Sequence, residues 1–291
     1  MQLRRLLVIL SGLEKFTTKI QLQQYLSQAR AGGKTIGLVP TMGALHQGHL
    51  SLIQLAQQQC DVVVCSIFVN PTQFNDPRDL EKYPRPIQED IIKLEDIGCD
   101  ILFEPAVNEI YDEHEQWHLD IGALEGLLEG KYRPGHYQGV TQVVYKFFTL
   151  VKPDIAYFGQ KDYQQFLIVK QMVKLLSLQV RLQMCPIKRE PDGLAMSSRN
   201  IHLSVDDHNH ALVLSKTLNH VSQNFNINNL AQLKQEAENT INNMPGVELG
   251  YFEIADGDTL LPASENSKTI VALVAAKVGN TRLIDNMIIR N

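Results

Sequence analysis

The sequence has few cysteines, few aromatic residues and no C-x-x-C pair. Its 291 residues include four cysteines and one tryptophan, and 7% of the side chains are aromatic. The scattered cysteines exclude a predicted disulfide framework and favour buried thiols in a reducing cytosol. They are Cys60, Cys65, Cys99 and Cys185.

Long runs of basic or apolar residues are also absent. Lys and Arg total 27 against 32 Asp and Glu, so the net charge is -5 and a broad nucleic-acid-binding surface is not expected. Arg4 and Arg5 precede an apolar run, as in a signal peptide, but that run covers only residues 6–10 and no small-residue cleavage site follows. No apolar stretch is long enough to span a bilayer, and a cytoplasmic protein is predicted.

The order of apolar segments predicts the fold. After the turn AGGK, a strand TIGLVPT, a helix GHLSLIQLAQQQ and a strand DVVVCSIFVN follow one another. The alternation continues, with a helix around TQVVYKFFTLV, to the strand LQVRLQMCPI. Parallel strands need long crossovers, so this order predicts an α/β fold with a doubly wound, Rossmann-like parallel sheet. After residue 187, helices are expected near DDHNHALVLSKTLNHVSQ and LAQLKQEAENTINN, followed by extended segments ELGYFEIAD and TIVALVAAKV. This order predicts a smaller α+β domain. We therefore expect domains at 1–187 and 188–291.

Polar clusters follow three of the predicted strands. PTMGALHQGH follows the first strand, NPTQFN follows the second, and GQKDYQQ follows the strand IAYFG. In an open parallel sheet, ligands bind at the carboxyl ends of the strands. Because packing does not explain polar residues at three such ends, the sequence predicts a ligand site there.

The first cluster places two imidazoles, His46 and His49, where a helix begins. The intervening glycine allows close backbone approach, and the helix N-terminus attracts an anion. Imidazole N–H groups there would donate to phosphate oxygens and stabilise charge that builds at phosphorus. The alternative makes His49 a helix cap and His46 a surface residue. A zinc pair is disfavoured because no third ligand stands nearby.

Two other segments offer further phosphate ligands. Lys161 stands where a strand meets a loop, and Asp162 is placed to cap the next helix. In AMSSRN, the hydroxyls of Ser197 and Ser198 precede the permanent charge of Arg199, so this loop would close over a triphosphate. A solvated lysine and an ordinary turn are the alternative interpretations.

Other phosphate and metal motifs are absent or incomplete. The sequence contains no G-x-x-x-x-G-K-[ST] and no G-x-G-x-x-G after a strand. HEQWH, from His114 to His118, matches the H-E-x-x-H zinc motif with Glu115 as the base, provided that it is helical. The extended motif requires Gly and His where Ile121 and Leu124 stand, so zinc chemistry is disfavoured. RPGHYQGV is consistent with a lid over the substrate or with a tight turn.

Taken together, PTMGALHQGH, SIFVNPTQF, YRPGHYQGV, FGQKDYQQ and DGLAMSSRN resemble the pantoate–β-alanine ligase family. YFEIADGDTLLP and GNTRLIDN extend this resemblance almost to the C-terminus. It implies a nucleotidyltransferase-like fold in which a HIGH-type histidine motif and a KMSKS-type loop bind ATP. The implied reaction condenses pantoate with β-alanine to pantothenate through a pantoyl adenylate, releasing AMP and pyrophosphate. The resemblance also implies Mg²⁺ and a homodimer.

The resemblance assigns roles to individual residues. The implied catalytic residues are His46, His49, Lys161, Ser197, Ser198 and Arg199, with His49 as proton donor. The implied ATP-binding residues are Met42, Gly43, Ala44, Leu45, His46, Gln47, Gly48, His49, Gly159, Gln160, Lys161, Asp162, Lys188, Met196, Ser197, Ser198 and Arg199. The implied substrate contacts are Gln73 and Gln165, with Asn70 and Tyr83 as neighbours. Lys188 stands where the family usually has an apolar residue, which suggests a main-chain contact.

Two other functions fit part of this pattern. A nucleotidylyltransferase that stops after adenylyl transfer shares the histidine motif, but the second domain and the paired glutamines argue against it. A non-catalytic nucleotide-binding protein is disfavoured because His49, Lys161 and Arg199 are all retained.

Overall fold

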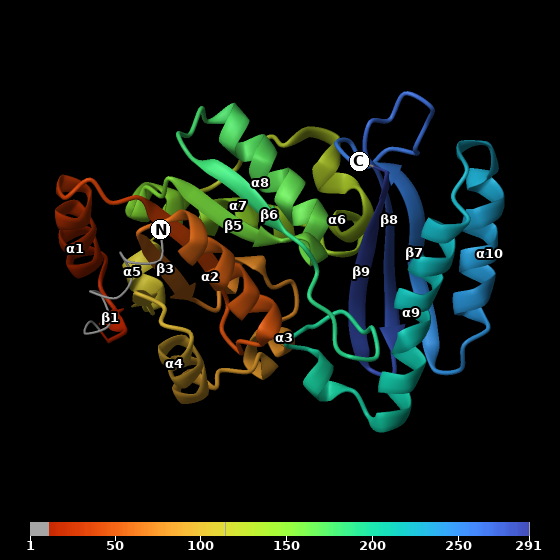
Figure 1. The fold of residues 1–291 in the computed structure, drawn as a ribbon, viewed down its shortest axis with the longest axis horizontal. Helices are drawn as coiled ribbons and strands as arrows, with labels where there is room; N and C mark the ends of the chain where they lie inside the picture. The colour runs from red at the N-terminus through yellow and green to blue at the C-terminus, as the bar shows by residue number, and fades with distance from the viewer. Residues whose placement is uncertain (1–11, 114, 291) are drawn as a thin grey trace. The chain divides into compact units, whose positions relative to one another are not determined.

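A computed structural model describes residues 12–113 and 115–290 (Figure 1). The signal-peptide-like run 6–10 lies outside the described residues. A six-stranded parallel sheet has the order β1-β4-β3-β2-β5-β6. Its strands are β1 (Glu14–Phe16), β2 (Ile36–Thr41), β3 (Val62–Ile67), β4 (Ile101–Phe103), β5 (Ile155–Gly159) and β6 (Arg181–Cys185).

The central strands are apolar because both of their faces are covered. All six residues of β3 are buried, and Ile36, Leu38 and Val39 of β2 have no exposed surface. Continuous apolar runs of this kind are typical of parallel strands between two helical layers. The helices of this part of the chain are α1 (Lys19–Ala31), α2 (Gln47–Gln59), α3 (Pro77–Lys82), α4 (Ile87–Asp96), α5 (Val107–Ile110), α6 (Leu128–Tyr132), α7 (His136–Val151) and α8 (Tyr163–Leu175).

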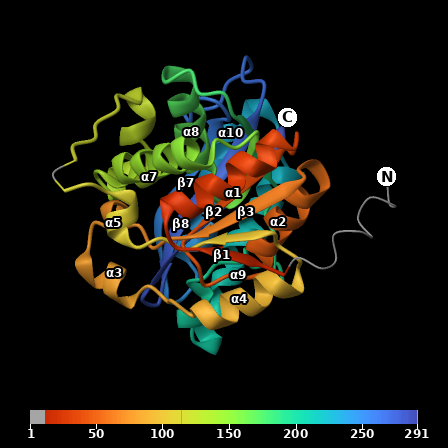
Figure 2. The ribbon, with the colours of Figure 1, turned by 90° about the vertical axis from the view of Figure 1, so that its left-hand side faces the viewer.

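Helices lie on both faces of the sheet (Figure 2). On one face, Arg30 of α1 donates to the carbonyl of Val151, where α7 ends, and to that of Lys152 at 3.1 Å. On the other face, α2 and α4 pack over one apolar cluster, and Gln57 donates to the carbonyl of Gly98 at 2.7 Å. The predicted doubly wound α/β sheet is therefore confirmed.

The strand order reverses between β2 and β5. The chain runs outward from β2 through β3 to β4, then returns to β5 on the other side of β2 and continues to β6. Ligands bind at such a switch point, beyond the carboxyl ends of the strands. The histidine segment follows β2 directly, so this topology places it where a doubly wound sheet binds its ligand.

The chain divides into two compact units. Unit 1 contains the parallel sheet and comprises residues up to Gly122, Tyr132–Gly159 and Ile168–Cys185. Unit 2 comprises Ala123–Lys131, Gln160–Leu167 and the residues from Pro186 onward. The sequence predicts a single boundary after residue 187, and none of its patterns indicates the two earlier segments of unit 2.

Unit 2 is built on a three-stranded antiparallel sheet, β7-β8-β9. An apolar cluster joins this sheet to its two long helices, and Phe252 and Leu218 at its centre have no exposed surface. The elements are α9 (Val205–Gln223), α10 (Leu230–Asn242), β7 (Val247–Asp256), β8 (Ile270–Val278) and β9 (Thr281–Arg290). The predicted C-terminal α+β unit is confirmed, but the sequence analysis did not identify β9 as a strand.

Polar side chains hold the two earlier segments within unit 2. Gln164 is buried and donates to the carbonyls of Leu124 and Leu127, both at 2.8 Å. Arg282 of β9 donates to Glu129 at 2.5 Å, and this carboxylate is only 7% exposed. Since each partner lies far along the chain, no local pattern predicts these bonds.

Three expectations about other segments have clear outcomes. All four cysteines are free; three are buried, and burial raises the pKa of Cys99 to about 12. Helix α7 begins at His136, five residues before the predicted TQVVYKFFTLV. Its N-cap residue is Gly135, which has a left-handed backbone conformation. No described helix is both long and apolar enough to cross a membrane.

Candidate active site

The predicted site residues fall into two groups, one in each unit. Unit 1 holds the histidine segment, Asn70, Gln73, Tyr83 and Gly159, whereas unit 2 holds Gln160–Asp162, Gln165, Lys188 and the Ser197–Arg199 loop.

The two histidines cap helix α2 reciprocally. His46 is the N-cap residue, and its Nδ1 accepts the backbone N–H of Gly48 at 3.1 Å. Nδ1 of His49 accepts the backbone N–H of His46 at 3.3 Å, which completes a capping box. The ring centroids are 4.0 Å apart. In the alternative interpretation His49 is a helix cap, as observed, but His46 is not a surface residue, because it is the N-cap residue and is half-buried.

This capping determines which ring nitrogen carries the proton. Because Nδ1 of each imidazole accepts a backbone N–H, the proton of the neutral ring lies on Nε2. An Nε2–H group is a hydrogen-bond donor suited to a phosphate oxygen. The helix that follows adds the positive end of its dipole. Capping and phosphate binding are therefore compatible in the same two side chains.

A buried amide pair follows β3. Asn70 and Gln73 are 1% and 8% exposed. Asn70 Nδ2 donates to Gln73 Oε1 at 3.2 Å and to the carbonyl of Gly139 at 3.0 Å. Its Oδ1 accepts the hydroxyl of Tyr111 at 2.7 Å. Gln73 lies in a 3₁₀ turn, Pro71–Gln73, and its Nε2 is 2.8 Å from Met42 Sδ, so this pair is linked to the histidine segment.

The RPGHYQGV segment forms a turn at the start of α7. Gly135 has a φ of 79°, which favours glycine, and it precedes the first helical residue. His136 is 6% exposed, and its Nδ1 donates to the carbonyl of Gln73 at 2.8 Å. Arg133 also reaches this carbonyl, at 3.4 Å. Of the two interpretations left open, the tight turn is the one observed, and it holds the backbone of Gln73 in place.

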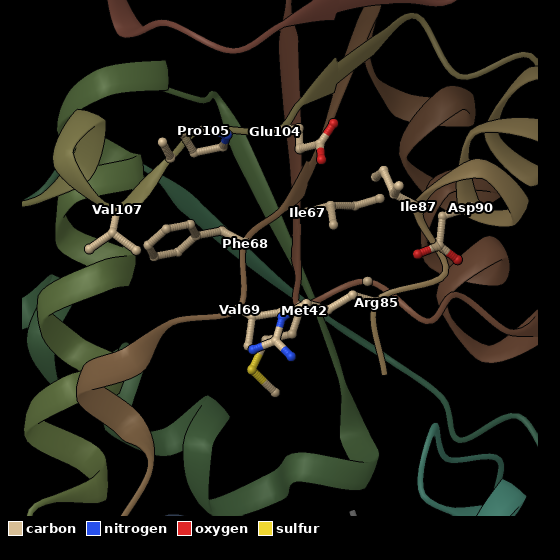
Figure 3. A pocket seen from close by; sticks show the side chains of 12 residues that line it. Met42, Ile67, Phe68, Val69, Arg85, Ile87, Asp90, Glu104, Pro105 and Val107 are labelled. Carbon is tan, nitrogen blue, oxygen red and sulfur yellow. The ribbon is translucent and has the colours of Figure 1, made fainter. Parts of the chain in front are cut away.

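A cavity of about 210 Å³ lies at the carboxyl ends of β2, β3 and β4 (Figure 3). Its lining is largely apolar and includes Met42, Ile67 and Phe68, with the carboxylates of Asp90 and Glu104 at its wall. Burial raises the pKa of Glu104. Tyr83, predicted as a neighbour of the substrate, does not line this cavity; its ring packs edge-on against Phe74 with the centroids 5.8 Å apart.

The described part of the HEQWH segment, residues 115–118, is not helical, whereas the zinc motif requires a helix. Helix α5 ends at Ile110, and the described residues 115–118 are irregular. Glu115 instead pairs with Lys146 of α7 at 2.5 Å, and Trp117 donates to the hydroxyl of Thr141 at 3.0 Å. Among the described residues, no group of three His, Cys, Asp or Glu side chains is arranged to hold a metal ion.

In unit 2, Lys161 lies in a 3₁₀ turn, Gln160–Asp162, that precedes α8. Asn286 of β9 holds this turn, because its Nδ2 donates to the carbonyls of Gln160 and Lys161, both at 2.9 Å. Asn286 Oδ1 accepts from the Gln160 side chain at 3.1 Å. Lys161 and Ser197 line one small cavity together with Asp285, so two of the predicted ATP-binding segments meet within unit 2.

A buried ion pair supports the loop that leads to Ser197. Arg189 donates to both oxygens of Asp285, at 2.6 and 2.9 Å, and to the carbonyl of Gly193 at 3.1 Å. Burial raises the pKa of Asp285, whereas the charges of Arg189 and Lys161 oppose that shift. The sequence analysis missed Arg189, Asp285 and Asn286, since their partners lie up to 126 residues away.

The remaining predicted residues of unit 2 lie on or near the hairpin that Arg189 and Ala195 close through an antiparallel bridge. The backbone N–H of Met196 donates to the carbonyl of Lys188 at 3.0 Å, so these two residues are neighbours at its base. The Lys188 side chain is exposed, in keeping with a main-chain role. Ser197 Oγ accepts the N–H of Arg199 at 3.2 Å, and Arg199 precedes a 3₁₀ turn, Asn200–His202. Gln165 is half-buried near the start of α8.

The fold and these side chains define a class of protein. A doubly wound parallel sheet whose switch-point loop carries donor groups at a helix N-terminus is a nucleotide-binding α/β enzyme. Its relatives identify the particular family. The family model for pantoate-beta-alanine ligase matches residues 14–288, and the chain belongs to this family.

Individual relatives match over nearly their whole length. The pantothenate synthetase of Porphyromonas gingivalis is 44% identical over 277 residues, which cover 94% of this chain and 99% of that protein. The pantothenate synthetase of Rhodopirellula baltica is 46% identical, with coverages of 94% and 98%. Among solved structures, pantothenate synthetase from Thermus thermophilus has a TM-score of 0.89 at 38% identity, covering 96% of this chain and 100% of that one.

A further solved relative carries ligands. Pantoate-beta-alanine ligase from Francisella tularensis, in complex with beta-gamma ATP and beta-alanine, has a TM-score of 0.79 and 35% identity. The match covers 96% of this chain and 98% of that chain.

Proposed function

We propose that this protein condenses pantoate with β-alanine to form pantothenate, in a reaction that consumes ATP and releases AMP and pyrophosphate. The observation that supports this most directly is the family match, which extends from residue 14 to residue 288. The relative from F. tularensis bound a form of ATP and β-alanine, which correspond to the expected adenylyl donor and amine.

The reaction has two steps. A pantoate carboxylate oxygen attacks the α-phosphorus of ATP, the bond to the bridging α–β oxygen breaks, and pyrophosphate leaves with that electron pair. The amine of β-alanine then attacks the acyl carbon of pantoyl adenylate, AMP leaves, and the nitrogen loses a proton. Since a carboxylate is already ionised at pH 7, the first step needs charge stabilisation and no general base.

The histidine segment, Met42–His49, acts on ATP in this proposal. The Nε2–H groups of His46 and His49 donate to phosphate oxygens, and their hydrogen bonds strengthen as negative charge moves onto the leaving pyrophosphate. Both imidazoles are oriented before ATP binds, because each Nδ1 is engaged by the backbone of α2. His49 is the proposed proton donor.

The residues of unit 2 supply charge and further donors. Lys161 and Arg199 would neutralise phosphate oxygens, with Ser197 and Ser198 as neutral donors. Gly159, Gln160, Asp162, Lys188 and Met196 are assigned to ATP binding. Asn286 and the Arg189–Asp285 pair keep the Lys161 turn and the Ser197 loop in register within unit 2.

Amides are the proposed ligands of pantoate. Gln73 and Gln165 would contact it, with Asn70 and Tyr83 nearby, since an amide both donates to and accepts from a hydroxyl. Gln73 is suited to this role because Asn70, Met42 and the turn before α7 hold it from three directions.

Mg²⁺ would arrive with the nucleotide. Mg²⁺ usually binds through one or two carboxylates plus substrate phosphates, so a site formed wholly by the protein is not required. We therefore propose MgATP as the substrate. A cytoplasmic location and a homodimer complete the proposal; sedimentation of the purified protein at twice the mass of the 32.9 kDa chain would support the dimer.

Isotope exchange tests the proposed route. Labelled pyrophosphate is expected to exchange into ATP when pantoate is present, without any need for β-alanine, because the first step is reversible and complete in itself. The overall reaction should form AMP and pyrophosphate. Formation of ADP and phosphate would contradict the adenylate route, and exchange with another acid in preference to pantoate would contradict the substrate assignment.

Replacing Lys161 with alanine tests the unit 2 group. We expect the rate of adenylation to fall by about 10²-fold or more, because one preorganised cation at the phosphates is lost. Lys174→Ala, at an exposed position of the same α8 region, is the matched control and should change the rate by less than about twofold. A loss below about threefold in Lys161→Ala would remove this residue from the mechanism.

A further inference from the structure

The loop that joins β2 to α2 has an unusual backbone. Gly43 has a φ of 79°, and Ala44 has a φ of 50°. The left-handed conformation is unfavourable for alanine, so it persists only where surrounding groups hold it. This loop ends at His46, and its conformation determines where the first residue of the histidine pair lies.

Asp90 of helix α4 supports this backbone conformation with two hydrogen bonds. Its Oδ2 accepts the backbone N–H of Ala44 at 2.7 Å, and its Oδ1 accepts the backbone N–H of Leu45 at 2.7 Å. The side chain is 1% exposed, so these bonds are shielded from water. Bonds from backbone N–H to an ionised carboxylate are among the stronger hydrogen bonds in proteins.

Two neighbouring side chains complete the support. Lys93, one turn further along α4, donates from Nζ to the carbonyl of Leu45 at 2.9 Å and lies 3.9 Å from Asp90 Oδ1. Thr41 Oγ1 accepts the N–H of Gly43 at 3.1 Å. Side chains therefore bind three consecutive backbone N–H groups and one carbonyl of this loop.

Packing is tight at Gly43, on the side of the loop that faces Ile67 and Asp90. A Cβ atom on Gly43 would lie 2.9 Å from Ile67 Cγ2 and 3.1 Å from Asp90 Oδ2, so the carboxylate packs directly against the glycine. Asp90 lies on the wall of the cavity beside Ile67 and Ile87 (Figure 3). A shift of Asp90 would therefore move the loop backbone with it.

A continuous chain of bonds connects Asp90 to the second imidazole. Asp90 holds the N–H of Leu45, the next backbone N–H is that of His46, and this group donates to Nδ1 of His49. Burial raises the pKa of Asp90, and the two backbone bonds and Lys93 oppose that shift. A buried carboxylate is costly, and both oxygens of this one accept backbone N–H groups of the loop.

We propose that Asp90, assisted by Lys93, is a positioning residue that sets the orientation of His46 and His49 toward the phosphates of ATP. This inference rests on the proposed function, which gives the two imidazoles their role. Asparagine at position 90 would keep the size of the side chain but offer one acceptor oxygen in place of two. One of the N–H groups of Ala44 and Leu45 would then face an amide NH₂.

A double-mutant cycle tests this proposal. Asp90→Asn, His49→Ala and the double variant are compared in pantoate-dependent exchange of pyrophosphate into ATP. We expect Asp90→Asn to lower the kcat of exchange by about 10-fold or more, since small misplacements of a catalytic group are costly. In the His49→Ala background, the same substitution should cost about threefold less than it does in the parent, because one of the two imidazoles that Asp90 positions is gone.

The matched control is Asp96→Asn, the same change at an exposed position of α4, which should leave the rate within about twofold of the parent. Thermal unfolding of every variant gives its melting temperature, which shows whether the variant is folded under the conditions of the exchange assay. If Asp90→Asn does not fold, Lys93→Met replaces it, since this keeps both bonds from Asp90 to the loop and removes the bond to the Leu45 carbonyl together with the longer ion pairs to Asp90 and Glu89. That variant should show a smaller loss with the same dependence on His49.

The outcomes separate the two proposals. Equal losses from Asp90→Asn with and without His49, or no loss at all, would refute the positioning role and leave the proposed function intact. A parental exchange rate in His49→Ala would refute the proposed role of the imidazole, and the positioning role with it.

Discussion

Replacing His49 with alanine is expected to lower the rate of pantoate-dependent pyrophosphate exchange by about 10²-fold or more. The side chain is held before ATP binds by the N–H of His46, so its Nε2–H would meet developing charge without reorganisation. The measurement is the kcat of exchange, with the KM values for ATP and pantoate determined separately. Loss of a donor used mainly in the transition state lowers kcat more than it raises KM.

The same substitution also removes half of the capping box, and this effect must be separated from the chemical one. Loss of a cap costs about 1 kcal/mol of stability, which thermal unfolding measures. His46→Asn gives the complementary variant, because asparagine is a good N-cap but carries no imidazole N–H. If His46 acts on phosphate, this variant keeps the stability of the parent but has a lower rate of exchange. A variant with both the parental stability and the parental rate would show that His46 is only a helix cap.

His220 provides the control for a histidine without a proposed role. It lies on α9 with 55% of its side chain exposed, and His220→Ala should leave exchange within about twofold of the parent. An exchange rate in His49→Ala within about threefold of the parent would remove His49 from the mechanism.

Gly139→Ala is expected to have the largest effect on the substrate amides. A Cβ atom at this position of α7 would overlap the carbonyl of Thr72 and lie 2.7 Å from the backbone nitrogen of Gln73. Backbone atoms cannot rotate out of the way, so α7 and the 3₁₀ turn Pro71–Gln73 must move apart. Such overpacking costs about 1–3 kcal/mol of stability.

The displacement should also reach the substrate. Asn70 donates to the carbonyl of Gly139, so the amide pair loses its anchor when α7 moves. We expect the KM for pantoate to rise by about 10-fold or more, while the KM for ATP changes much less. Gly126→Ala is the matched control, because nothing lies within 4 Å of its Cβ position. Unchanged stability together with an unchanged KM for pantoate would contradict the assignment of Asn70 and Gln73.

Much of the fold follows from local patterns. The apolar runs of β2 and β3 and the helix between them are visible in the sequence because parallel strands buried on both faces are continuously apolar. The C-terminal helices α9 and α10 also lie where the sequence predicts helices. β9 escaped prediction because its sequence, TRLIDNMIIR, mixes polar residues that bind within unit 2 with apolar ones.

For the candidate site, too, the sequence predicted some features correctly and others only the structure shows. The sequence placed His46 and His49 at a helix start, which is correct, but it set capping and phosphate binding against each other. The structure shows that the two imidazoles cap α2 through Nδ1, which leaves Nε2–H as the donor. HEQWH was disfavoured as a zinc motif because its extended form is incomplete; its described residues, 115–118, are irregular, and Glu115 pairs with Lys146.

By itself, the sequence determined the alternation of strands and helices from β2 to β6, the absence of a disulfide pattern among the cysteines and the residue types available for phosphate chemistry. These properties depend on periodicity and composition over a few neighbouring residues. Only the tertiary structure decided which side chains hold the phosphate-binding segments in place. Asp90 binds the loop before His46, and Asn286 binds the Lys161 turn. A hydrogen bond between residues 46 or 125 positions apart depends on how the chain is folded, and neighbouring residues carry no signal of it.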